Sequence, residues 1–220
     1  MPVSLPAHIV RILVALVLGS ALAACDSSPG PTLPNPTRPT AATTSPEPAE
    51  LAALRARPLR LPTFAAGDPC PVTQPLPLDP PPPAGHPLVC CDGGPALALG
   101  RAPLFPAAGY FRGEGTQVHL QVKETSPGWY GSKAPWASRP GYRGWVLIRT
   151  ARLDGPGRGR VELQIDGSPD ISGDSIGVNE EADWQFWPGV TEVTGAGCYA
   201  YQVDGSGFTE VIVFRAELAA

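Results

Sequence analysis

Histidine, lysine and long apolar runs are scarce in this 220-residue sequence, and each scarcity excludes a class of function. The chain has three histidines, and Lys123 and Lys133 are its only lysines. With a formal net charge of −4, the chain is a poor match for nucleic acid or anionic lipid as partners. It lacks a phosphate-binding loop and a dinucleotide fingerprint. We therefore expect a protein without a cofactor and without catalytic activity, and keep a hydrolase as an alternative.

What the sequence does contain begins with the order of a secretory signal. Arg11 precedes an apolar run from Ile12 to Leu18, and small residues then lead to Cys25. Even with its flanking alanines and glycine, the run is roughly a dozen residues long, against roughly 20 needed for a helix to cross a bilayer. We do not expect it to remain as a transmembrane span.

The residues Leu22-Ala23-Ala24-Cys25 resemble the lipobox of bacterial lipoproteins. In that family the cysteine thiol is diacylated and the signal is removed just before it. The resemblance implies a cleaved signal peptide over 1–24 and a protein held by lipid on Cys25 at the extracytoplasmic face of the cell membrane, or in an outer membrane. An ordinary secretory signal and a monotopic helix are the alternatives. Because each buried CH₂ contributes about 0.8 kcal/mol, two or three acyl chains suffice as an anchor.

Composition divides the rest of the chain into a linker and one domain. Residues 25–58 are rich in Pro, Ser, Thr and Ala, which predicts a disordered, extended stalk. Residues 51–57 could form two helical turns before Pro58, and we assign them to this linker. The domain is then 59–220, a size typical of a single folded unit.

Apolar alternation with a period of two predicts an all-β domain. Val118, Leu120 and Val122 share one face of a predicted strand, and residues 160–166 repeat the pattern. Further short aromatic and β-branched runs are bounded by glycine, with a hairpin signal at 204–207. The proline-rich stretch 74–83 is excluded from a central strand, because proline lacks the donor that strand pairing needs. These features predict one antiparallel β-sandwich.

Four blocks of the domain are similar to a group of uncharacterised bacterial secreted proteins or lipoproteins. The blocks are Leu61–Thr73, Gly128–Lys133, Arg143–Arg149 and Gly197–Gly205. The last block contains a Cys-Tyr-x-Tyr strand that resembles the final strands of immunoglobulin-like bacterial surface domains. The resemblance implies an immunoglobulin-like sandwich outside the cytoplasm and assigns no reaction.

Four cysteines remain once Cys25 is set aside, and they allow three pairings. We predict a disulfide between Cys70 and Cys198, which joins the start of the domain to a late strand. Cys90 and Cys91 then either pair with each other or remain thiols. A metal site built from His86 and these adjacent cysteines is disfavoured, because neighbouring cysteines chelate one ion poorly.

The stretch 166–183 is an acidic loop. Its carboxylates, Asp166, Asp170 and Asp174 among them, are the oxygen ligands that Ca²⁺ takes, but the spacing of an EF-hand is absent. We expect a solvated loop without a metal, and keep these three residues as calcium candidates. A hydrolase would need two such carboxylates at a fixed separation.

Aromatic residues supply the remaining candidate site. The possible ligand surface comprises Trp129, Tyr130, Trp136, Trp184 and Trp187. Exposed on one face they would stack against sugar rings, whereas buried they would fill the core; we expect most to be core. The leading hypothesis is a non-catalytic envelope lipoprotein that presents a surface to an envelope protein or glycan. A carbohydrate- or peptidoglycan-binding module is the first alternative.

Overall fold

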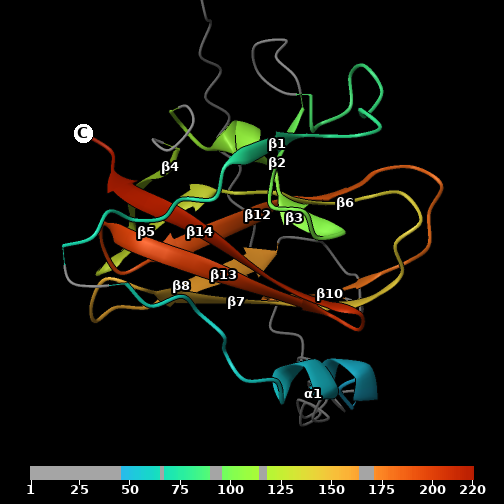
Figure 1. Ribbon diagram of the computed structural model, residues 1–220, viewed down its shortest axis with the longest axis horizontal. Coiled ribbons are helices and arrows are strands. Elements are labelled where there is room, and N and C mark those ends of the chain that lie inside the picture. Colours follow the sequence, from blue (N-terminus) through green and yellow to red (C-terminus); the bar gives the residue numbers. More distant parts are fainter. Residues whose placement is uncertain (1–45, 65–66, 90–95, 114–117, 164–170) are drawn as a thin grey trace, which may run out of the picture. The chain divides into compact units, whose positions relative to one another are not determined.

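The computed structural model describes residues 46–64, 67–89, 96–113, 118–163 and 171–220 (Figure 1). Strands dominate these residues, and α1, Ala49–Arg55, is the one α-helix among them. The predicted sites Cys25, Cys90, Cys91, Asp166 and Asp170 lie outside the described residues. The mainly β character that the alternation indicated is confirmed.

One large curled sheet forms the body of the domain. Its nine strands follow the order β8-β12-β5-β4-β14-β13-β7-β10-β9. Their bounds are β4 His119–Ser126, β5 Trp129–Lys133, β7 Gly144–Arg152, β8 Gly159–Leu163, β9 Ile171–Ser172, β10 Ser175–Val178, β12 Gly189–Val193, β13 Gly197–Gly205 and β14 Phe208–Leu218. Two small sheets complete the sandwich-like arrangement: β11 (Gln185–Trp187), β6 (Trp136–Ser138) and β3 (Leu104–Pro106) form one, and β1 (Pro75–Pro77) with β2 (Leu97–Leu99) the other. A 3₁₀ turn spans Ala108–Tyr110.

The large sheet curls until its two ends almost meet. Ala151 of β7 forms a bridge with Arg158, just before β8. At the far end of β8, the Leu163 amide donates a hydrogen bond to the carbonyl of Gly173, between β9 and β10, at 2.9 Å. The sheet is therefore close to a barrel, which gives its strands a concave, apolar inner side and a convex outer side.

The prediction of purely antiparallel pairing is wrong at one place. β14 pairs in parallel with β4, with Arg215 opposite His119 and Leu218 opposite Val122. The hairpin with β13 occupies one edge of β14 and sets its direction. Its other edge accepts β4, whose apolar residues then face the same interior.

Aromatic side chains fill the interior of the curl. The rings of Tyr201 and Phe214 stack with centroids 4.4 Å apart, and Trp136 meets Tyr201 edge to face at 5.2 Å. Trp136 comes from β6, so the three-stranded sheet covers the concave side and completes this core. Its opposite side carries Phe105 and Ala137, which pack with Leu78 from the proline-rich region and with Leu88. As predicted, that region supplies no central strand, only β1 in a two-stranded pair.

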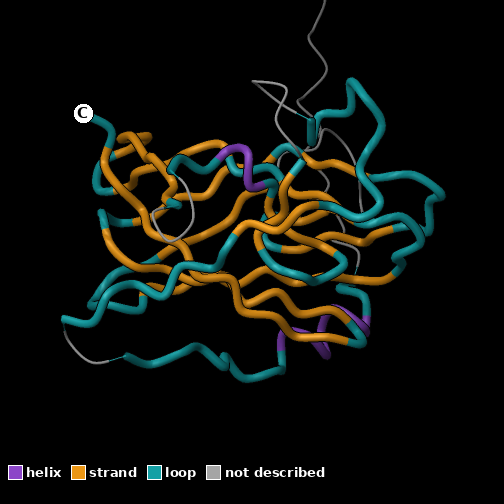
Figure 2. The backbone as a smooth tube through the Cα atoms, turned by 45° about the horizontal axis from the view of Figure 1, so that its top comes forward, coloured by secondary structure: helices purple, strands orange, loops and turns teal. Residues whose placement is uncertain are grey.

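The folded unit begins earlier than the predicted boundary at residue 59. Leu51 and Leu54 of α1 are buried against Leu147 of β7, 3% and 1% exposed. We call residues 46–64 the strap. From α1 the strap runs along the sheet towards its opposite end (Figures 1 and 2). The predicted helical turns at 51–57 thus exist, but they belong to the domain, because two leucines three residues apart give them an apolar side.

Candidate functional site: a clasp that holds the strap

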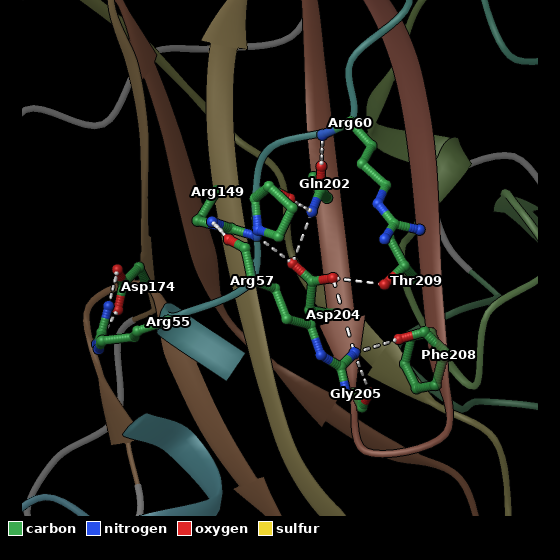
Figure 3. A network of polar contacts seen from close by, with 11 residues as sticks. Arg55, Arg57, Arg60, Arg149, Asp174, Gln202, Asp204, Gly205, Phe208 and Thr209 are labelled. Atoms are coloured by element: carbon green, nitrogen blue, oxygen red, sulfur yellow. Dashed lines mark hydrogen bonds and ion pairs between the residues drawn. The ribbon is translucent and has the colours of Figure 1, made fainter. Parts of the chain in front are cut away.

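Asp204 on β13 is a fully buried carboxylate at the centre of a polar network (Figure 3). It accepts hydrogen bonds from Arg149 Nη2 at 2.6 Å, Thr209 Oγ1 at 2.6 Å and Gln202 Nε2 at 3.0 Å. Arg57 Nη1 lies 3.9 Å from its Oδ1. We call Arg57, Arg149, Gln202, Asp204 and Thr209 the clasp.

The environment of Asp204 keeps it ionised. Burial by itself would raise the pKa of this carboxyl. The hydrogen bonds from Thr209, Arg149 and Gln202, together with the charge of Arg149, outweigh burial and lower the pKa below its ordinary value. The clasp therefore contains a true ion pair between β13 and β7.

Side chains of the clasp bind the backbone of the strap. Arg149 Nη1 donates to the carbonyl of Arg57 at 2.6 Å, and Gln202 Nε2 donates to the carbonyl of Pro58 at 3.0 Å. The amide of Arg60 donates to Gln202 Oε1 at 2.5 Å. The strap is thus bound through its main chain by residues that point outward from the sheet, a mode that needs no strand pairing.

The side chain of Arg57 secures the hairpin between β13 and β14. It donates to the carbonyls of Gly205 at 2.8 Å, Phe208 at 3.1 Å and Ser206 at 3.2 Å. Only glycine fits at position 205, since a Cβ there would lie 2.2 Å from the Phe208 ring. The predicted hairpin at 204–207 is confirmed, and its turn is also a docking point for the strap.

Both ends of the strap are fixed to the sheet. At α1, Arg55 forms a two-pronged ion pair with Asp174, each contact 2.8 Å, and its Nε contacts Glu47 at 2.6 Å. Beyond the far end, Cys70 and Cys198 form the predicted disulfide, with Cα atoms 5.6 Å apart. The calcium candidate Asp174 is therefore engaged by a guanidinium.

The chemistry of the clasp is that of binding. A cavity of about 250 Å³ adjoins it, lined by Arg57, Pro58, Arg60, Gln202, Asp204 and Thr209. Each oxygen of Asp204 already accepts a hydrogen bond from the protein, and this lining contains no cysteine, serine or histidine. The arrangement suits the retention of an extended segment.

The structure separates the predicted aromatic surface. Trp136, Trp184 and Trp187 are buried, 0%, 8% and 8% exposed. Trp129 and Tyr130 are half-buried and follow each other on β5, so they point to opposite sides of the sheet. Tyr130 packs against the core. A five-residue stacking platform is therefore not formed, because the small sheets carry its members into the interior.

The other chemical candidates are dispersed. The described residues contain no group of three or more potential metal ligands. His86 accepts a hydrogen bond at Nδ1 from the Leu88 amide at 3.2 Å and meets Phe186 edge to face. The carboxylate of Asp174 is paired with the guanidinium of Arg55.

Sequence reasoning did not identify the clasp. Asp204 precedes glycine in a turn motif, and Arg149 only ends an apolar run. The one signal in the sequence was that a charged residue, Arg149 or Asp204, stands at the end of a predicted strand. No protein-family model, curated protein or solved structure matches the chain. Within the described ranges, no helix has the length and apolarity required to span a membrane.

Proposed function

We propose that this chain is a lipid-anchored envelope protein whose non-catalytic β domain is held firmly at the end of a tether and presents a surface to another envelope component. The observation that carries the proposal is the clasp, which fixes the entry of the chain onto the outer side of the sheet. The anchor rests on the lipobox residues that end at Cys25. An immunoglobulin-like relationship stays a prediction and rests on the Cys198-Tyr199-x-Tyr201 strand.

The energetics of the contacts favour retention of the strap. Release of the strap would break three hydrogen bonds of its main chain with Arg149 and Gln202, each worth about 0.5–1.5 kcal/mol. Burial of each leucine side chain of α1 adds about 1.5–3 kcal/mol. The exposed pair of Arg55 with Asp174 adds only about 0–1 kcal/mol. A pull on the tether is therefore resisted by α1 and the clasp together, near the middle of the large sheet.

The anchor itself is tested by acyl labelling. Cells that express the full chain are fed a labelled fatty acid, and the protein is recovered and sized. We expect label in the wild-type protein and none in Cys25→Ser, which should accumulate as a precursor or a differently cut form. Cys91→Ser, which leaves the lipobox intact, should keep the label. Normal label in Cys25→Ser would refute the anchor.

A further inference from the structure

The outer side of the four strands β8, β12, β5 and β4 carries a group of cations. The register places Lys123 beside Gly131, Gly131 beside Glu192, and Glu192 beside Arg160. Outward residues alternate along each strand, so Trp129 and Lys133 share the side of Gly131. We call Lys123, Trp129, Lys133, Arg158 and Arg160 the cationic face.

Trp129 organises the two arginines of this face. Arg160 Cζ lies 4.4 Å and Arg158 Cζ 5.5 Å from the centre of its ring. Arg160 also donates through Nε to Glu192 at 2.7 Å, and Glu192 accepts from Thr125 Oγ1 at 2.6 Å. The guanidinium of Arg160 is thus held between an aromatic ring and a carboxylate, which lowers the entropy that binding would otherwise cost.

Three members of the cationic face form no ion pair, and the exposed Glu162 of β8 lies on the same outer side. Lys123, Lys133 and Arg158 are exposed, and none of them forms an ion pair with another described residue. They gather on one side of a chain whose formal net charge is −4. A local excess of positive charge on an acidic protein attracts an anionic partner.

The side chains around these cations indicate which anion fits. The exposed large hydrophobic residues among the described ones are Leu59 and Leu218, on the strap and at the end of β14. The face therefore lacks the aliphatic side chains that enter a lipid interface. Interface cores between proteins are apolar and poor in lysine, unlike this surface. Because guanidinium groups already lie over Trp129, its ring is less suited to a neutral sugar than to a ligand with carboxylates.

We propose that the cationic face binds a linear glycan that carries carboxylate groups. Arg158 binds a carboxylate through paired N–H donors, while Lys123 and Lys133 contact further charges along the glycan. The inference rests on the proposed function in one respect, since it names the envelope component that the domain meets. It does not depend on lipid at Cys25.

Binding is measured by calorimetry with the full chain in non-ionic detergent. The probe is polygalacturonate, a linear carboxylated sugar polymer, and dextran is the neutral comparison. We expect binding to polygalacturonate that weakens as salt rises, and none to dextran. Lys123→Ala/Lys133→Ala should weaken binding about 2- to 30-fold, if each exposed ion pair is worth about 0.2–1 kcal/mol. Arg158→Ala should weaken it further.

The matched control removes two exposed charges from elsewhere, with Arg101→Ala/Arg143→Ala, and should change the affinity less than twofold. Equal losses in both pairs would overturn the proposal, and so would equal affinity for dextran or no binding to polygalacturonate. Stronger binding of the Cys25→Ser protein, without detergent, to phosphatidylglycerol vesicles than to the glycan, lost when Lys123→Ala/Lys133→Ala is added, would also overturn it in favour of a membrane surface. Cys25→Ser protein should bind polygalacturonate normally, so failure here is distinct from failure of the anchor.

Discussion

A single carboxylate, Asp204, links three parts of the chain that are distant in sequence. Arg149 comes from a strand 55 residues earlier, and the strap that covers it lies more than 140 residues earlier. From the sequence, Asp204 is a turn residue before Gly205, and that reading was correct for the hairpin. Its burial could not be predicted, since it depends on a segment that composition had assigned to the linker.

The charge of Asp204 should make stability depend on pH in a defined direction. Its pKa in the folded protein is lowered, so its contribution is fully present above the unfolded value of about 4 and is lost as pH falls through the folded value. Asp204→Asn should destabilise the protein at pH 7 by about 3 kcal/mol, because Arg149 loses its buried partner. The difference from wild type should shrink below pH 4.

Urea unfolding at a series of pH values from 7 to 3 measures this effect. Asp183→Asn provides the control, because Asp183 is exposed and should show the same stability as wild type throughout. A destabilisation by Asp204→Asn that stays constant from pH 7 to pH 3 would show that the charge is not what the clasp uses.

At the scale of elements, local sequence patterns predicted individual strands, but they did not predict which strands pair with each other. Alternation predicted β8 and much of β4, and an apolar run that follows glycine predicted β14. The parallel pair of β14 with β4 leaves no local signature, because either direction satisfies the same alternation. α1 was predictable only in part. Leu51 and Leu54 indicated helical turns, but the residue they pack against, Leu147, is almost a hundred residues away in the sequence.

Leu54→Ala should release α1 from the sheet without unfolding the domain. The side chain is 1% exposed, and removal of a buried leucine costs about 2–5 kcal/mol. A seven-residue helix does not persist alone in water, so amides 52–57 should exchange with deuterium much faster. Ala53→Ser, at an exposed position, should change exchange little. Uniformly faster exchange across β13 and β14 as well would contradict a separate opening of α1.

At the scale of the whole molecule, closure of the sheet decides which residues meet water. Trp136 and Trp187 are interior because β6 and β11 lie across the concave side, and the spacing of these residues along the chain contains no information about that. The cationic face has the same origin. Its members come from three separate stretches of sequence, and only the register of four strands brings them to one side.

The disulfide gives the whole fold a measurable share of its stability. Cys70 and Cys198 are 128 residues apart, and on the chain-entropy model such a closure contributes about 4–5 kcal/mol. Cys70→Ala/Cys198→Ala should therefore lower the free energy of unfolding by about that amount in urea titrations. Reductant should destabilise the wild-type protein similarly and affect the double variant much less. A loss below about 1 kcal/mol would show that the strained or residual structure of the chain cancels the entropic gain.

In the lipid-anchored protein that we propose, the same disulfide would also limit how far the domain can move from the membrane. If α1 detached from the sheet and the clasp released the strap, the chain from residue 46 to Cys70 would become available as extra length. Twenty-four residues of extended chain span about 80 Å, after which the covalent bond between Cys70 and β13 stops further extension. Detachment of the strap would thus lengthen the connection to the domain by a limited amount. The domain could then sample a wider volume while its sheet stays folded.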